Sequence, residues 1–260
     1  MSTLDVGVVT EWLTIPGPDT QLTLFVARPP VPEPWPAVVV LPENLGITEW
    51  RQQESARLAA EWGYAVVTMS TYSRIGAKPP PGPFATQDDR RRAAFLAMPD
   101  EQVAGDVQAA IAWVRQQPQF RPDAVAVLGF CSGGGQALYA ACTRDGLAEC
   151  LVVIYGNIIL RPEFTEDRQP LDRLPLIRDL DVVVQGHFGS LDHEIPPEHV
   201  DRLETELGRH GKTGEIYRYE GARHVFSDET HPNYDRAATS LMWQRIGRFL
   251  HEHLDRDPVG

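Results

Sequence analysis

The chain has 260 residues, of which 42% are hydrophobic, and its formal net charge at pH 7 is -12. This length is enough to bury one sizeable core and is common among single α/β domains, so we expect one domain over residues 1–260. The acidic balance repels nucleic acid and anionic membranes, and no apolar run approaches the length of a membrane span, so neither is an expected partner.

Predicted strands and helices alternate along the chain, which begins without the pattern of a signal peptide. The strand segments are short and most are apolar, and they lie at 22–29, 35–42, 64–70, 123–129, 150–156, 181–187 and 214–221. The helical segments lie at about 48–62, from Asp100 onward, at about 133–144, at 196–210 and after Pro232. This order predicts an α/β fold with a mostly parallel sheet covered by helices on both faces. Functional residues are then expected in the loops at the carboxyl ends of the strands.

Local patterns predict which residues are buried and where helices end. Residues 22–29 alternate apolar and polar side chains, as a half-exposed strand does, whereas 35–42 is a continuous apolar run typical of a strand buried on both faces. Gly63 is expected to end the first helix, and Asp100 to cap the second. The buried stripes of the second and last helices are expected to be Val103, Val107, Ile111 and Val114, and Leu241, Met242, Ile246, Phe249 and Leu250. Residues 156–180 show no clear element.

A cysteine stands among glycines at the end of a predicted strand, in the sequence GFCSGGG. Gly129 and Gly133 flank Cys131 two residues away on either side, which is the nucleophile-elbow pattern with cysteine in the serine position. The turn is so sharp that side chains at the two glycine positions would collide with backbone, and the nucleophile takes up strained dihedral angles that expose it. A helix N-terminus at this place favours the thiolate. The local alternative is a small buried cysteine at a tight bend.

An acid and a histidine follow later strands in equivalent places. Asp192 lies in GSLDHEIP and His224 in GARHVF, each just beyond a predicted strand. The order Cys131, Asp192, His224 is the nucleophile, acid, histidine order of α/β-hydrolases. In such a triad the histidine exchanges a proton with the nucleophile and the leaving group, while the carboxylate holds the histidine's tautomer. Taken singly, Asp192 is better explained as a turn former or helix cap, and His224 as a surface histidine; the three residues together, in this order, favour the triad.

The sequence PENLG follows the predicted strand 35–42. The loop after this early strand normally supplies one backbone N–H that stabilises a negative oxygen, and the residue after the nucleophile supplies the other. Asn44 and Ser132 are therefore the expected oxyanion-hole residues. Glu43 beside them is unusual, because a carboxylate near a thiol opposes its ionisation. Its alternative role is that of a loop residue bonded to local backbone.

These stretches, together with TYSRIG, resemble the dienelactone hydrolase family from about residue 20 to the last helix. The resemblance implies an α/β-hydrolase fold and a cofactor-free hydrolase that cleaves a small carboxylic ester or lactone through an acyl-enzyme. It implies that Cys131, Asp192 and His224 are the catalytic triad. It also implies that Glu43 holds the thiol at rest and shifts when substrate binds.

The resemblance further implies two arginines that grip a substrate carboxylate. One falls on Arg74, in TYSRIG. The other lies four residues after the histidine, where this chain has Asp228. This departure predicts poor activity on a carboxylated dienelactone and better activity on neutral or differently shaped esters.

Two other classes of function are compatible with parts of the sequence. A non-catalytic homologue that binds a ligand is one. A metal-dependent hydrolase is the other, because His187, His193, His199 and His231 lie near the same regions. Their spacing lacks a pair such as H-E-x-x-H on one helix, so no metal is expected. The sequence leaves the physiological substrate and the oligomeric state open.

The remaining cysteines and the one basic cluster are expected to be structural. Cys142 and Cys150 are expected in the core, and an odd number of cysteines without a framework spacing favours a reduced, cytoplasmic protein. Arg90–Arg92 is interpreted as the solvated surface of a helix.

Overall fold

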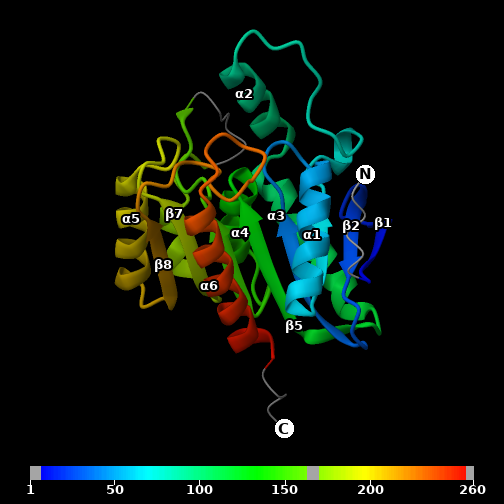
Figure 1. Cartoon of the computed structure of the whole chain (residues 1–260). Coiled ribbons are helices and arrows are strands. Elements are labelled where there is room, and N and C mark those ends of the chain that lie inside the picture. Colours follow the sequence, from blue (N-terminus) through cyan, green and yellow to red (C-terminus); the bar gives the residue numbers. More distant parts are fainter. Residues whose placement is uncertain (1–6, 163–169, 256–260) are drawn as a thin grey trace.

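One eight-stranded sheet runs through the part of the chain that the computed structural model describes, residues 7–162 and 170–255 (Figure 1). Its strands, in spatial order, are β1 (Val9–Pro16), β2 (Gln21–Arg28), β4 (Ala65–Met69), β3 (Trp35–Leu41), β5 (Phe120–Phe130), β6 (Cys150–Ile154), β7 (Val183–Gly189) and β8 (Gly214–Tyr219). The strands from β4 to β8 in this order are parallel, and β1 and β2 are antiparallel to their neighbours. The predicted α/β fold with a mostly parallel sheet is confirmed.

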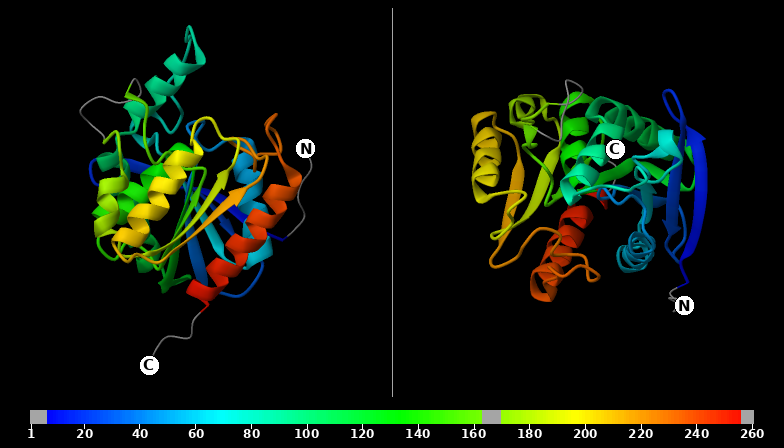
Figure 2. Two further views of the ribbon diagram at one scale, coloured as in Figure 1. Left: turned by 90° about the vertical axis from the view of Figure 1, so that its left-hand side faces the viewer. Right: turned by 90° about the horizontal axis from the view of Figure 1, so that it is seen from above.

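Helices cover both faces of this sheet. They are α1 (Glu49–Trp62), α2 (Gln87–Ala97), α3 (Asp100–Gln116), α4 (Ser132–Thr143), α5 (Pro197–Arg209) and α6 (Arg236–Leu254). Seen from above, α1 and α6 lie on one side of the sheet and α3, α4 and α5 on the other, while α2 stands over one end (Figure 2). Two hydrophobic cores result. Alternate residues of one strand enter different cores, as Val39 packs with α3 and α4 and Val38 with α1 and α6.

The antiparallel edge differs from the sequence prediction. The alternation of β2 predicted a half-exposed strand, yet Leu22 and the run from Leu24 to Ala27 are buried. The reason is β1, which the sequence did not predict, because its residues are mostly exposed and carry no apolar run. Since β1 takes the edge and pairs with β2 along its whole length, β2 becomes an inner strand.

Most helix predictions hold, with two corrections. Gly63 ends α1 in a left-handed conformation (φ 72°), and the predicted stripe of α3 is buried. Asp100, however, does not cap α3. It is fully buried, and each carboxylate oxygen accepts a hydrogen bond of 2.8 Å from the guanidinium of Arg173. In α6, Leu241 is 42% exposed, whereas the other four predicted residues are buried.

The Asp100–Arg173 pair fixes part of the segment that showed no clear element. Arg173 also donates a hydrogen bond of 2.5 Å to the backbone oxygen of Asn157, just after β6. Ile159 and Asp172 form an isolated β-bridge, and a 3₁₀ helix, η3 (Leu174–Asp179), follows. Residues 163–169 of this segment lie outside the described residues. Among the described helices, none combines the length and the apolar character needed to cross a membrane.

The turn from β5 into α4 allows no side chain at two glycine positions. A Cβ on Gly133 would lie 2.5 Å from the backbone oxygens of both Leu41 and Pro42, at the end of β3. A Cβ on Gly129 would lie 2.3 Å from the oxygen of Gly133 itself. These contacts are far below van der Waals distance with atoms that cannot rotate away. The start of α4 is therefore pressed directly against the loop that follows β3.

We predict that Gly133→Ala lowers the free energy of unfolding by about 1–3 kcal/mol, because overpacking here must move backbone. Urea denaturation followed by circular dichroism measures this. Gly208→Ala in α5 is the matched control, since a Cβ there meets nothing within 4 Å. It should raise stability by about 0.5–1 kcal/mol through helix propensity. Equal changes in the free energy of unfolding for the two substitutions would contradict the close approach of Gly133 to the backbone of Leu41 and Pro42.

Candidate active site

Cys131 occupies the turn between β5 and α4. Its backbone dihedral angles, φ 51° and ψ -116°, lie in a region that residues other than glycine rarely adopt. Cys131 is also the N-cap of α4, so the partial positive charge of the helix terminus acts on its sulfur. The side chain is partly exposed, whereas Cys142 and Cys150 are buried as expected. All three are free thiols.

His224 and Asp192 meet Cys131 in a line of two hydrogen bonds. The Sγ of Cys131 lies 3.1 Å from Nε2 of His224. On the other side of the ring, Nδ1 lies 2.8 Å from Oδ2 of Asp192. Asp192 is itself held in place, because its Oδ1 accepts the backbone N–H groups of Glu194 (2.8 Å) and Ile195 (2.9 Å). The carboxylate accepts from Nδ1–H of the ring, so in the neutral histidine the lone pair of Nε2 faces the sulfur and can take its proton.

The surroundings favour a protonated imidazole at His224. Burial alone disfavours the charged ring and lowers its pKa. The neighbouring Cys131 and Asp192 outweigh burial and raise the pKa of His224 to about 10. At neutral pH the ring is then charged, and its Nε2–H can donate to the sulfur of Cys131.

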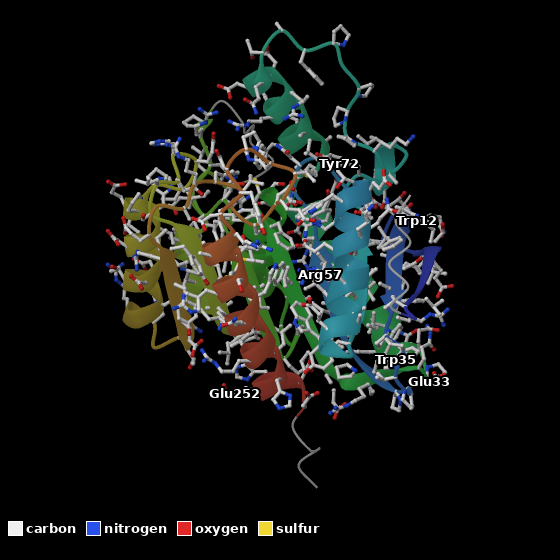
Figure 3. The ribbon with its side chains drawn as sticks, in the orientation of Figure 1. Trp12, Glu33, Trp35, Arg57, Tyr72 and Glu252 are labelled. Carbon is white, nitrogen blue, oxygen red and sulfur yellow. The ribbon has the colours of Figure 1, made fainter. Side chains whose placement is uncertain are left out.

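The loop after β3 brings backbone next to the sulfur. Glu43 and Asn44 border the same cavity as Cys131. Ser132 opens α4, so its N–H has no acceptor within the helix. The hydroxyl of Tyr72 donates to the backbone oxygen of Asn44 (2.9 Å), which fixes this peptide. Figure 3 shows Tyr72 near the end of the sheet over which α2 stands. The predicted oxyanion pair, Asn44 and Ser132, thus lies on two segments that the Gly133 contact holds together.

Glu43 is bound by an arginine rather than by the thiol. Arg51 of α1 donates to Oε1 of Glu43 through Nη2 and to Oε2 of Glu54 through Nη1. Burial raises the pKa of Glu54 to about 7, although Arg51 and Arg57 lower it. The three groups form a buried cluster of one cation and two carboxyl groups, which we call the Arg51 cluster.

The cavity at Cys131 has a volume of about 140 Å³. The loops at the ends of β3, β5, β6, β7 and β8 form its floor and sides, and α2 covers it with Gln87, Arg90, Arg91 and Phe95. The sequence assigned Arg90–Arg92 to a solvated surface, but Arg90 and Arg91 line this cavity. Arg91 pairs with Glu194 at 2.7 Å and so ties α2 to the loop that carries Asp192.

Of the two positions that the family resemblance places at a substrate carboxylate, Asp228 lies at the cavity and Arg74 does not. Asp228 lines the cavity, and its Oδ1 accepts hydrogen bonds from the backbone N–H and the hydroxyl of Thr230. Arg74 does not line the cavity. Its guanidinium is bound by Asp106, which is fully buried, and by Asp19. The expectation that Arg74 grips the substrate is therefore corrected, because two carboxylates far away in the sequence hold it elsewhere.

The four histidines considered as metal ligands, His187, His193, His199 and His231, do not form a cluster in the described residues. Over residues 7–162 and 170–255, no three His, Cys, Asp or Glu side chains gather as a metal site. His187 is buried against the hydroxyl of Tyr219 (2.8 Å) and the amide oxygen of Gln185 (2.9 Å), and burial lowers its pKa to about 3. His231 lines the Cys131 cavity, where its Nδ1 accepts the backbone N–H of Asn233.

Sequence reasoning missed Asn157 and Arg51. The Oδ1 of Asn157 lies 3.7 Å from the sulfur of Cys131, and its backbone N–H donates to the Cys131 oxygen (3.1 Å). It follows β6 just as the other site residues follow their strands, and this position was the available signal. Arg51 carried no such signal, since an arginine in the first turn of a helix normally faces solvent.

Comparisons with known proteins agree on one family. The sequence model of the Dienelactone hydrolase family matches residues 22–254. A protein of Escherichia coli O157:H7, provisionally named carboxymethylenebutenolidase, is 29% identical over 248 residues, which are 95% of this chain and 88% of that protein. A Bradyrhizobium protein, provisionally named 2-oxo-3-(5-oxofuran-2-ylidene)propanoate lactonase, is 26% identical over 247 residues, 95% and 96% of the two chains. The fold matches the crystal structure of a provisionally named dienelactone hydrolase from Klebsiella pneumoniae, with a TM-score of 0.85, 24% identity and coverage of 94% and 99%.

We predict that Cys131→Ala lowers the pKa of His224 below its value of about 10, because the substitution removes the anion that stabilises the charged ring. Titration of the imidazole resonances by NMR measures this. Cys142→Ala, which removes a buried cysteine of α4, should leave the titration unchanged. A pKa that stays near 10 in the Cys131 variant would mean that Asp192 alone holds the proton.

Proposed function

The chain belongs to the dienelactone hydrolase family, and from this membership we propose that it hydrolyses a small carboxylic ester or lactone with Cys131 as nucleophile. The observation that carries the proposal is the line of contacts from Asp192 through His224 to the Cys131 sulfur, 2.8 and 3.1 Å long. Since the partly exposed sulfur borders a cavity, a substrate carbonyl can reach it.

In the proposed reaction the ionised sulfur of Cys131 attacks the carbonyl carbon of the ester. A carbon–sulfur bond forms and the carbonyl oxygen becomes an oxyanion, which the N–H groups of Asn44 and Ser132 stabilise. The carbon–oxygen bond to the leaving group then breaks, and His224 gives its proton to the departing oxygen. In a lactone this opens the ring, and the new hydroxyl stays on the acyl group.

The thioester left on Cys131 is removed by water. His224, now neutral, takes a proton from water as the hydroxide oxygen attacks the thioester carbonyl. The carbon–sulfur bond breaks, the carboxylic acid leaves, and the sulfur and charged imidazole are restored. Asp192 holds the ring in one orientation through both halves and stabilises its charge. The reaction needs no cofactor, and its thiol must stay reduced, for which reason we place the enzyme in the cytoplasm.

The charges around the cavity favour a neutral substrate. Glu43 is paired with Arg51, and Arg91 with Glu194. Asp228 and Arg90 then remain as opposite charges on the cavity wall. Of the arginines that line the cavity, Arg91 is neutralised by Glu194, and Arg74 is held away from the cavity by Asp106. We propose neutral or differently shaped esters as better substrates than the carboxylated dienelactone.

We predict that Cys131→Ala lowers hydrolysis of a neutral short-chain ester by at least about 10³-fold, because the acyl-enzyme can no longer form. Asp192→Asn should lower it by roughly 10²–10⁴-fold, since the histidine loses its required tautomer. Steady-state kinetics measure both, and mass spectrometry of wild type quenched during turnover should show an acyl adduct on Cys131. Cys150→Ala is the control and should keep its activity. Turnover retained by the Cys131 variant would remove the proposal, and an inactive wild type would favour a ligand-binding homologue.

We predict that wild type has a higher kcat/KM for a neutral ester than for a carboxylated dienelactone. Asp228→Arg should raise kcat/KM for the dienelactone by roughly ten- to a hundredfold, because a charge-assisted hydrogen bond replaces a repulsion. Asp228→Asn separates the loss of repulsion from the gain of a cation. A wild-type preference for the dienelactone would contradict this substrate class and point to Arg90 as the residue that binds the carboxylate.

A further inference from the structure

The Arg51 cluster places one cation and two carboxyl groups in the protein interior next to the active site. The side chain of Arg51 is 1% exposed, that of Glu54 is 5% and that of Glu43 is 12%. A buried guanidinium must be paired, because its desolvation is costly. Arg51 has two carboxyl groups to choose from, and only one of them, Glu43, borders the Cys131 cavity.

Arg51 packs against the residue that precedes the nucleophile. Its guanidinium carbon lies 3.6 Å from the ring centroid of Phe130, the residue directly before Cys131. The ring of Trp50 lies on it at 4.4 Å. Stacking between aromatic faces fixes the plane of a guanidinium, and so the direction in which its N–H groups point. Arg51 can therefore hold Glu43 in one position.

The sulfur of Cys131 makes no hydrogen bond to Glu43 among the contacts of the described residues. Within residues 7–162 and 170–255, the hydrogen-bond partners of the Cys131 Sγ are Nε2 of His224 (3.1 Å) and Oδ1 of Asn157 (3.7 Å), of which the amide oxygen accepts from the thiol in its protonated form. Glu43 borders the same cavity, but its carboxylate is turned to Arg51. An unpaired carboxylate at this border would repel a thiolate. Paired with Arg51, it has little net charge to do so.

We propose that Arg51 is a positioning residue that draws Glu43 away from Cys131 and cancels its charge, so that the reactive thiolate–imidazolium pair exists before substrate binds. The inference rests on the proposed function and deepens it. It differs from the role that the family resemblance implies for Glu43, in which the carboxylate holds the thiol until substrate arrives. Here the nucleophile is ready at all times, and the free enzyme should react with any small electrophile that enters the cavity.

Glu54 is the competitor for Arg51. It borders a second cavity of about 340 Å³ between α1 and α6, through which water can reach it. Figure 3 shows Arg57 in this region. The charged and titratable groups that act on Glu54 come from three segments: Arg51 and Arg57 of α1, Glu43 of the loop after β3, and Asp228 of the loop after β8. When Glu54 carries a proton, Arg51 is left to Glu43 alone. Glu54→Gln should therefore leave the nucleophile fully reactive.

The test is the rate of alkylation of Cys131 by iodoacetamide, measured without substrate between pH 6 and 9. We use Glu54→Gln as the background, so that loss of Arg51 leaves Glu43 as the single carboxyl group of the Arg51 cluster. In this background Arg51→Gln should slow alkylation at pH 7 at least tenfold, the effect of about one unit in the pKa of a thiol. Adding Glu43→Gln should restore the rate to within about threefold, because the repelling charge is gone. Glu43→Gln by itself should change little.

Three controls keep the result specific. Arg57→Gln removes a cation of the same helix that does not contact Glu43 and should leave the rate unchanged. Cys131→Ala gives the background from the two buried cysteines. Arg51→Lys keeps the charge and should retain most of the rate, which provides a second variant if Arg51→Gln does not fold.

Two outcomes would overturn the inference. One is a wild-type alkylation rate in the Arg51→Gln variant of the Glu54→Gln background. If that variant does not fold, the equivalent result is an Arg51→Lys variant that is alkylated as slowly as expected for Arg51→Gln. The other is a slow rate that Glu43→Gln does not restore, which assigns Arg51 a purely structural role. Failure of the proposed function is distinguishable, because it would appear as hydrolysis retained by Cys131→Ala, whatever the alkylation rates are.

Discussion

The contact between Gly133 and the carbonyl oxygens of Leu41 and Pro42 is the constraint on which the rest of the site depends. It presses the first turn of α4 against the end of β3, so that two segments far apart in sequence share one backbone surface. The nucleophile comes from one segment and Glu43 and Asn44 from the other. A missing Cβ thus determines the distance between the sulfur and the groups that can act on its charge.

Two buried arginines hold the loops around this contact. Arg51 binds Glu43, and Arg173 binds both Asp100 and the backbone oxygen of Asn157. Each is 1% exposed, so removal of a partner would leave an uncompensated buried charge. Such pairs add little to overall stability compared with apolar packing, but they allow few alternative arrangements of the chain. Both place a side chain, Glu43 or Asn157, at the border of the Cys131 cavity.

The sequence predicted those parts of the fold and site that depend on local pattern. Apolar runs marked the parallel strands, and Gly129-x-Cys131-x-Gly133 marked the sharp turn, because sterics there act over a few residues. Pairing between distant residues was not predictable. Asp100 looked like a helix cap because its partner Arg173 is 73 positions away. Arg74 matched a family position, yet Asp106 and Asp19 bind it outside the cavity. The strand β1 was missed because an exposed edge strand needs no apolar run.

The residues proposed to carry the chemistry and the residues that face the substrate lie on different parts of the fold. Cys131, Asp192 and His224 follow the ends of parallel strands, where the sheet fixes their spacing. The cover of the cavity is α2, which lies outside the layers of the sheet (Figure 2). Two ion pairs, Arg91–Glu194 and Arg161–Asp88, join it to the rest of the chain. Residues of α2 can change without moving the strand ends. A chain of this construction can therefore keep one hydrolytic centre while the charges that face the substrate are replaced, as the exchange of an expected arginine for Asp228 illustrates.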